Sequence, residues 1–241
     1  MTTTLCFDFG NTRLKAAVFH DDQYIETYIL QEENNAEIEK IIRQYQPNYT
    51  ILSSVIHHQS TTEDMLRHHS AFHKLSNNSN LPFTIPVGKP ETVGADRLAL
   101  CAAATYLFPQ KNTLAIGLGT CITYNFLNKN HQFLGGSISP GLEMRFRSMH
   151  NQTALLPLVN MEWNFPLIGY DTKTNLLSGV AWGMAKEIDG IIDAYEEKFN
   201  DFNVILTGGD TLHFAPLLKK QIFADSNLIF KGLYAISLCN R

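Results

Sequence analysis

The sequence predicts an α/β protein built from two similarly folded lobes that follow one another along the chain. The first observation is a repeated segment, because residues 4–19 read TLCFDFGNTRLKAAVF and residues 113–126 read TLAIGLGTCITYNF. The second is that each copy passes from a strand pattern through a glycine-containing turn into another strand pattern. The third is that a helical pattern and a short apolar strand follow each copy. One continuous α/β sheet with an accidental repeat is the alternative.

Alternating and helical spacings place the expected elements of both copies. The expected strands are 3–9, 13–19, 24–30 and 50–56 in the first copy, and 113–118, 121–127, 132–138 and 203–210 in the second. The expected helices are 34–45, 95–108, one beginning soon after Pro140, which suits a first helical position, and 174–199. The predicted lobes are residues 1–85 and 110–241, with residues 86–109 at their junction.

Composition excludes several classes of protein. The 44% hydrophobic content supplies a sizeable core, and no segment is apolar enough to cross a membrane. The formal net charge of −4, without a basic block, disfavours nucleic acid and anionic membranes as partners. The four cysteines, at 6, 101, 121 and 239, fit neither a metal site nor a disulfide framework, and no secretory signal is expected. We therefore expect a soluble cytoplasmic protein.

The first turn, DFGNT at residues 8–12, carries groups suited to phosphate. Its glycine lets backbone N–H groups approach phosphate oxygens, and Thr12 adds a hydroxyl. Asp8, at the strand end, is placed to hold a phosphate-bound Mg²⁺ directly or through water, and Lys15 to neutralise phosphate charge. An ordinary hairpin turn capped by the aspartate is the alternative.

Two further glycine motifs point to a nucleotide. The second copy has its own turn at Gly119 and Thr120, and the strand at 203–210 ends with Gly208 and Gly209. Two phosphate turns and a glycine pair on the adenosine side predict ATP in a cleft between the lobes. The pattern G-x-x-x-x-G-K-[ST] is absent, and GLGTCI lacks the third glycine of a dinucleotide fingerprint.

The segment GADR at residues 94–97 opens an alanine-rich helix, whose N-terminus favours an anionic group. Here Asp96 could take the proton of an attacking hydroxyl, and Arg97 could hold a carboxylate or phosphate. A plain helix-dipole complement is the alternative. Thr172 and Thr174 precede the long helix, and one of them is expected to be its N-cap.

The histidines at 57, 58, 68, 69 and 73 are not expected to bind a metal. His69 and His73 are four residues apart, but the segment around them is predicted to be a polar helix surface without a carboxylate at matching spacing. The metal hypothesis is therefore set aside.

Taken in order, these motifs resemble those of the type III pantothenate kinases. The matching segments are DxGNT at 8–12 with Lys15, GADR at 94–97, GT at 119–120, FLGGSISPG at 133–141, GYDT at 169–172 with SG at 178–179, and TGG at 207–209. The resemblance implies a duplicated actin-like ATPase fold of ribonuclease-H-like lobes, and ATP-dependent phosphorylation of pantothenate to 4′-phosphopantothenate, the first step toward coenzyme A. It also implies a cytoplasmic homodimer, with the pantothenate pocket near the subunit interface, and a monovalent cation, K⁺ or NH₄⁺.

The resemblance also implies roles for individual residues. Together with the glycine motifs above, the expected ATP-binding residues are Asp8, Phe9, Gly10, Asn11, Thr12, Arg13, Leu14, Lys15, Gly119, Thr120, Gly208 and Gly209. The expected pantothenate contacts are Gly94, Ala95, Asp96, Arg97 and Thr172, with Asp96 as the catalytic base.

Two positions depart from the pattern of the family. Gly117 stands where its members usually carry an aspartate associated with the monovalent cation, and Val87 where many carry a tyrosine. The cation site, if retained, therefore lacks its acid. A catalytically impaired relative that binds or regulates is the alternative function, and a kinase for another small alcohol is a third.

Overall fold

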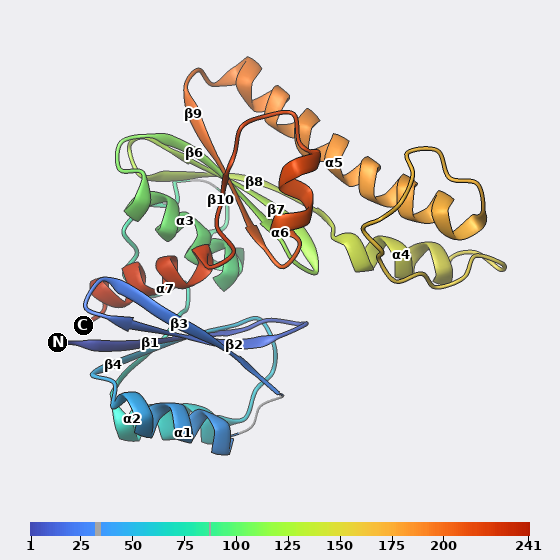
Figure 1. The fold of residues 1–241 in the computed structure, drawn as a ribbon. Coiled ribbons are helices and arrows are strands. Elements are labelled where there is room, and N and C mark those ends of the chain that lie inside the picture. The colour runs from blue at the N-terminus through green and yellow to red at the C-terminus, as the bar shows by residue number, and fades with distance from the viewer. Residues whose placement is uncertain (32–34, 87) are drawn as a thin grey trace. The chain divides into compact units, whose positions relative to one another are not determined.

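The computed structural model describes residues 1–31, 35–86 and 88–241, drawn in Figure 1. The chain forms two compact units. The first comprises Met1–Gln110, Leu127–Leu134 and Asn227–Arg241, and the second comprises Lys111–Phe126 and Gly135–Ser226. Val87 lies outside the described residues. None of the described helices is long and apolar enough to cross a membrane.

The first unit is a five-stranded sheet with helices on both faces. Its strands are β1 (Thr3–Phe9), β2 (Leu14–His20), β3 (Gln23–Leu30), β4 (Tyr49–Ser54) and β5 (Ala71–Lys74), in the order β3-β2-β1-β4-β5. β1 runs antiparallel to β2 and parallel to β4. The helices are α1 (Asn35–Tyr45), α2 (Ser60–His69), α3 (Ala95–Leu107) and α7 (Leu228–Cys239), with a short 3₁₀ turn, η1 (Pro90–Thr92).

Apolar spacing decides which helices cover which face of this sheet. In α1, Ile38, Ile41 and Ile42 form one buried stripe, and they share a core with Phe7 and Leu66. The opposite face is covered by α7, which contacts β1 and β4 and packs against α3 (Figure 1). β1 is consequently buried along most of its length.

The second unit is built around a second five-stranded sheet. Its strands are β6 (Asn112–Leu118), β7 (Cys121–Asn128), β8 (Gln132–Pro140), β9 (Phe202–Gly208) and β10 (Phe223–Ala224), in the order β10-β9-β6-β7-β8. The helices are α4 (Leu142–Asn151), α5 (Thr172–Lys198) and α6 (Thr211–Phe214), with a 3₁₀ turn, η2 (Ala215–Leu217). α5 buries a long apolar stripe, from Leu177 to Ile192, against the core side of β6 and β7.

The two sheets have the same topology. Read from the opposite edge, the second order is β8-β7-β6-β9-β10, which matches β3-β2-β1-β4-β5 strand for strand. In both, the first strand pairs in parallel with the fourth. This confirms the predicted duplicated α/β fold and excludes one continuous sheet.

The structure corrects several expected elements. His73 lies on strand β5, not on a helix with His69, because residues 71–74 pair in parallel with β4. Pro140 ends β8, and Gly141 is the N-cap of α4. The compact units also differ from the predicted lobes, because residues 86–109 group with the first unit and α7, which no sequence pattern predicted, packs there as well.

Candidate functional site

The first turn presents its backbone to solvent at the end of β1. It spans residues 10–13, and the Gly10 N–H donates to the Arg13 carbonyl at 3.1 Å. Asn11, Thr12 and Arg13 are all exposed. The turn therefore offers accessible backbone without a bulky side chain at its first position, as binding of phosphate requires.

Asp8 belongs to a small group of charged side chains just before this turn. It pairs with Lys15 on β2 and with Ser53 on β4. Burial raises the pKa of the Asp8 carboxyl to about 7, and the charge of Asp96 adds to this, while Lys15 and the Ser53 hydroxyl act in the opposite direction. Burial likewise lowers the pKa of Lys15, against the attraction of Asp8. The structure thus brings Asp8, Lys15 and Asp96 within electrostatic reach of one another.

The start of α3 places Asp96 and Arg97. Gly94 is the N-cap, and its carbonyl accepts the Leu98 N–H at 3.0 Å. A Cβ on Gly94 would lie 2.6 Å from Asp96 Oδ1, so the carboxylate folds back over the glycine. The Arg97 guanidinium lies 5.4 Å from the centre of the Phe133 ring. A partly buried carboxylate in the first turn of a helix can accept a proton from a bound hydroxyl.

These carboxylates suit a magnesium ion. Mg²⁺ in kinase sites is held by one or two carboxylates together with substrate phosphates, rather than by a full protein cage. Asp8 and Asp96, next to an exposed turn, match that donor set. No cluster of three or more His, Cys, Asp or Glu side chains that could hold a metal occurs among the described residues.

The turn of the second unit is tighter. Only residues 119 and 120 separate β6 from β7, both are exposed, and the Gly119 N–H donates to the Cys121 carbonyl at 3.1 Å. Gly141, which sequence reasoning did not single out, supports this turn: its N–H donates to the Thr120 carbonyl at 3.1 Å. A Cβ on Gly141 would lie 2.2 Å from the Gly119 carbonyl oxygen. The Pro-Gly pair directly before α4 is the sequence feature that could have identified this glycine as structurally important.

The two glycines that end β9 have different roles. Gly208 has a φ of +110°, and a Cβ there would lie 2.0 Å from the Leu118 carbonyl oxygen. Only glycine fits such a position. The Gly209 N–H donates to that carbonyl at 3.1 Å, but a Cβ on Gly209 would meet nothing within 4 Å. Gly208 is therefore required by the fold, while Gly209 has open space beside it.

Gly117 and Thr172 complete the predicted residues of the second unit. Gly117 is partly buried on β6, where it pairs with Thr207. Neither threonine caps α5: the N-cap is Asp171, whose carboxylate accepts the Thr174 N–H at 2.7 Å. Thr174 completes this capping box, because its hydroxyl accepts the Asp171 N–H at 3.1 Å. Thr172 is left exposed as the first residue of the helix.

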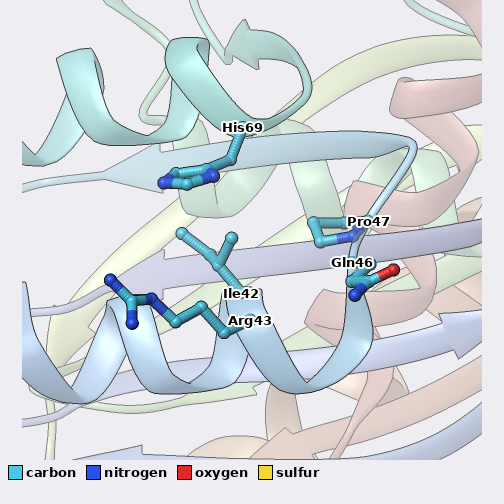
Figure 2. A pocket seen from close by; sticks show the side chains of 5 residues that line it. All are labelled: Ile42, Arg43, Gln46, Pro47 and His69. Carbon is cyan, nitrogen blue, oxygen red and sulfur yellow. The ribbon is translucent and has the colours of Figure 1, made fainter.

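One shallow hollow of about 310 Å³ lies elsewhere on the first unit (Figure 2). Ile42 and Arg43 reach it from α1, and His69 from the end of α2. This is the end of the sheet where β1 begins, since Asn48 N–H donates to the Thr3 carbonyl. Asp8 is at the other end of that strand, so the hollow does not belong to the candidate site.

Comparisons with known proteins agree with this arrangement. A family model described as type III pantothenate kinase matches residues 4–194. The chain is 41% identical over 233 residues to a type III pantothenate kinase of Flavobacterium johnsoniae, covering 95% of each chain. It is 40% identical over 239 residues to one of Christiangramia forsetii, covering 98% of each.

Solved structures agree on the fold. A ROK family glucokinase from Streptomyces griseus, in complex with glucose and AMPPNP, aligns with a TM-score of 0.55 and 11% identity, covering 99% of each chain. At that identity the likeness concerns the fold alone, which is the duplicated actin-like ATPase fold. The family match covers most of the chain and includes the turns and the start of α3. This chain belongs to the type III pantothenate kinase family.

Proposed function

We propose that this protein transfers the γ-phosphoryl group of ATP to pantothenate, giving 4′-phosphopantothenate on the route to coenzyme A. The observation that carries the proposal is the group of Asp8, Lys15 and Asp96 beside an exposed turn, which combines a metal-binding carboxylate, a phosphate-binding cation and a base. Family membership supplies the substrate, because the named relatives are pantothenate kinases.

Positioning and charge neutralisation perform most of this chemistry. In the proposed mechanism the N–H groups of residues 10–12 and the Lys15 ammonium bind phosphate oxygens, and Asp8 holds Mg²⁺, which neutralises phosphate charge when bound. Asp96 orients the primary hydroxyl of pantothenate and takes its proton as the oxygen attacks the γ-phosphorus, while the bond to the β,γ-bridging oxygen breaks and ADP leaves. Arg97 fixes the substrate through its guanidinium.

The remaining predicted residues have supporting roles in the proposal. Phe9, Arg13 and Leu14 frame the first turn, Gly119 and Thr120 form a second phosphate turn, and Gly209, next to Gly208, leaves room for the nucleoside side of ATP. Gly94 and Ala95 hold the helix start against pantothenate, and Thr172 adds a further contact. These assignments remain predictions.

The proposed monovalent cation has no carboxylate ligand at residue 117. Gly117 offers no carboxylate, so we propose that K⁺ or NH₄⁺, if bound, is held by backbone carbonyls and water, and that the enzyme depends on it only weakly. Assays with and without each ion test this directly.

A homodimer in the cytoplasm is the proposed state of the protein. Large apolar side chains that a monomer rarely exposes gather on the segment before α5: Leu155 (93% exposed), Leu167 (68%), Ile168 (83%) and Tyr170 (82%). A second copy of the chain would cover them. The four cysteines are free, as in a reducing compartment. Sedimentation equilibrium measures the mass of the assembly.

Pantothenate-dependent release of ADP is the decisive experiment. It is run with Mg²⁺-ATP in buffer free of K⁺ and NH₄⁺, then with each ion added, and with other small alcohols in place of pantothenate. Turnover with pantothenate is expected without added ion. Absence of turnover under every salt would favour the impaired relative, and preference for another alcohol would replace the substrate.

A further inference from the structure

A histidine that no step above uses lies beside the first turn. β4 is parallel to β1, with Ser54 opposite Phe9, and the Val55 N–H donates to the Phe9 carbonyl at 3.1 Å. His58 follows shortly after this strand end. Its ring meets the Phe9 ring edge to face, with centroids 5.8 Å apart at 83°. His58 therefore contacts the residue that leads into the turn.

Polar contacts on both sides fix the His58 ring. Nδ1 lies 3.0 Å from Ser54 Oγ, and that hydroxyl donates to the Ile56 carbonyl at 2.9 Å. Nε2 lies 2.9 Å from Oε1 of Glu63 on α2. The side chains of His58 and Glu63 are only 6% and 13% exposed. Any rotation of the ring would break a shielded contact, which makes its position well defined.

Glu63 also accepts hydrogen bonds from two cationic side chains. Lys74 Nζ, on β5, donates to Oε1 at 2.7 Å, and an Arg67 guanidinium nitrogen donates to Oε2 at 2.7 Å. The hydrogen bond from Lys74, with those from His58 and Arg67, outweighs burial and lowers the pKa of Glu63 to about 2. The carboxylate is therefore a fixed, ionised acceptor for His58.

We propose that His58, oriented by Glu63, is a positioning residue for the phosphate turn of residues 10–12. The inference rests on the proposed function, in which these residues bind ATP. Phe9 precedes Gly10 directly, so a shift of the Phe9 ring or of Ser54 would carry the turn with it. Through His58, the packing of α2 and β5 sets the place of groups that must meet phosphate oxygens within a fraction of an ångström.

The test compares His58→Gln and Glu63→Gln with the matched control His73→Gln. His73 is a histidine of the same unit that also contacts a serine, with Nε2 2.8 Å from Ser79 Oγ, but it pairs with Ile51 away from the turn. For each protein the melting temperature, kcat, the KM values for ATP and pantothenate, and the calorimetric Kd for Mg²⁺-ATP are measured below the melting transition.

Both test variants are expected to raise the KM and the Kd for ATP on the order of tenfold, with the KM for pantothenate unchanged. The control is expected to leave all three constants unchanged, although its melting temperature falls. A residue that only stabilised the fold would lower the melting temperature without this split between substrates. An unchanged affinity for ATP in folded His58→Gln and Glu63→Gln, or an equal rise in His73→Gln, overturns the inference.

Failure of the proposed function gives a different result. A wild-type protein that binds Mg²⁺-ATP but leaves pantothenate unphosphorylated contradicts the proposed substrate alone, and the Kd values of the variants still decide the role of His58. A wild-type protein that binds no ATP contradicts both.

Discussion

The turn that follows the first strand of each sheet lies beside the same backbone hydrogen bond, but the side chains around the two turns differ. In each sheet the carbonyl that ends the first strand accepts an N–H from the residue after its parallel neighbour, Val55 to Phe9 and Gly209 to Leu118, both at 3.1 Å. In this shared arrangement Asp8 corresponds to Gly117. Each is the residue before the last of its strand, and Asp8 pairs with Ser53 as Gly117 pairs with Thr207.

The turn lengths and the side chains around this shared backbone arrangement differ between the units. The first has a four-residue turn, a charged group around Asp8, and a serine side chain at the position where the second has Gly208. The second has a two-residue turn, with open space beside Gly209. The two copies thus share a backbone arrangement, but the charged group lies in the first copy and the close backbone approach in the second.

The largest effect is expected from removing the Asp96 carboxylate, which tests whether the proposed catalytic base lies in the first copy alone. α3 begins with Asp96 in its first turn, whereas α7, its counterpart after the second sheet, has no acidic residue in its first turn. Asp96→Asn is expected to lower kcat about 10³-fold, because the base is lost, with little change in the KM for ATP. Steady-state ADP release measures both. Asp64→Asn, an exposed acid of α2, is the control, and near-normal kcat in Asp96→Asn would remove Asp96 as the base.

The second prediction concerns the glycine that the second copy requires. Gly208→Ala is expected to lower the free energy of unfolding by about 3 kcal/mol, because the new Cβ meets a carbonyl oxygen and φ is positive. Gly209→Ala, with free space around it, is expected to change stability by less than about 0.5 kcal/mol. Urea midpoints compare the two. Equal losses would show that the close approach at Gly208 is relieved easily.

Gly94→Ala separates position from charge at the start of α3. The added Cβ would displace Asp96 Oδ1, the end of a flexible side chain, so stability is expected to change little. Misplacement of the base is expected to lower kcat on the order of 30-fold. Measuring kcat and the melting temperature of Gly94→Ala and of the wild type distinguishes a misplaced base from a destabilised fold. A fall in both, or in neither, contradicts the assigned contact.

Gly117→Asp restores to the second copy the acid that the first copy keeps. A carboxylate ligand attracts a cation, so the K⁺ concentration for half-maximal activation is expected to fall about tenfold, equivalent to about 1.4 kcal/mol. Activity is titrated with KCl in potassium-free buffer. The same titration of Ala115→Asp, on the same strand but fully buried, serves as a control for a misplaced acid. A K⁺ response identical to that of the wild type would place the cation elsewhere.

The smallest effect compares the carboxylates that link elements in each unit. Glu63 joins α2, β5 and the segment after β4, and Glu187 joins α5 to Tyr124, Ser139 and Arg145. The pKa of Glu63 is lowered to about 2, so its contribution is present above its ordinary pKa of 4.5 and is lost as pH falls toward 2.

Glu63→Gln is therefore expected to be less stable than the wild type by about 1 kcal/mol at pH 7, because water screens its ion pairs with the half-exposed Arg67 and Lys74. The difference should shrink between pH 5 and about pH 2, because the wild type loses the ion pairs there. Urea midpoints across this range measure it. Glu187→Gln is the counterpart, and a constant difference at every pH would assign the loss to packing instead.

Local sequence patterns were sufficient for the strands that carry the turns. β1, β6 and β7 lie within one residue of the predicted bounds, because alternation and a glycine-containing turn are encoded by adjacent residues. The predictions failed where distant contacts decide. α7 reads LIFKGLYAISLC, apolar on all sides and interrupted by Gly232, so no helical periodicity is visible. A Cβ on Gly232 would lie 1.8 Å from the Ala99 carbonyl oxygen, which explains the glycine.

The residues of the candidate site could be predicted from the sequence, but their arrangement in space could not. Asp8 and Asp96 follow from their positions at a strand end and a helix start, but their mutual influence depends on how α3 is placed in the first unit. The capping residue of α5 was predicted wrongly, because Asp171, Thr172 and Thr174 can all serve as caps and only the backbone selects one. The role of Gly141 depends on contact with the turn at Gly119 and Thr120, which is distant in the sequence.

The packing of α7 has a consequence for how the chain is made. The strand that carries Asp8 is synthesised well before the helix that covers its second face, which is α7, residues 228–239. A growing chain therefore presents an uncovered apolar face of β1 and β4 until α7 has been synthesised. Nascent-chain maturation of the first unit must wait for the second, which makes assistance by chaperones most valuable late in translation.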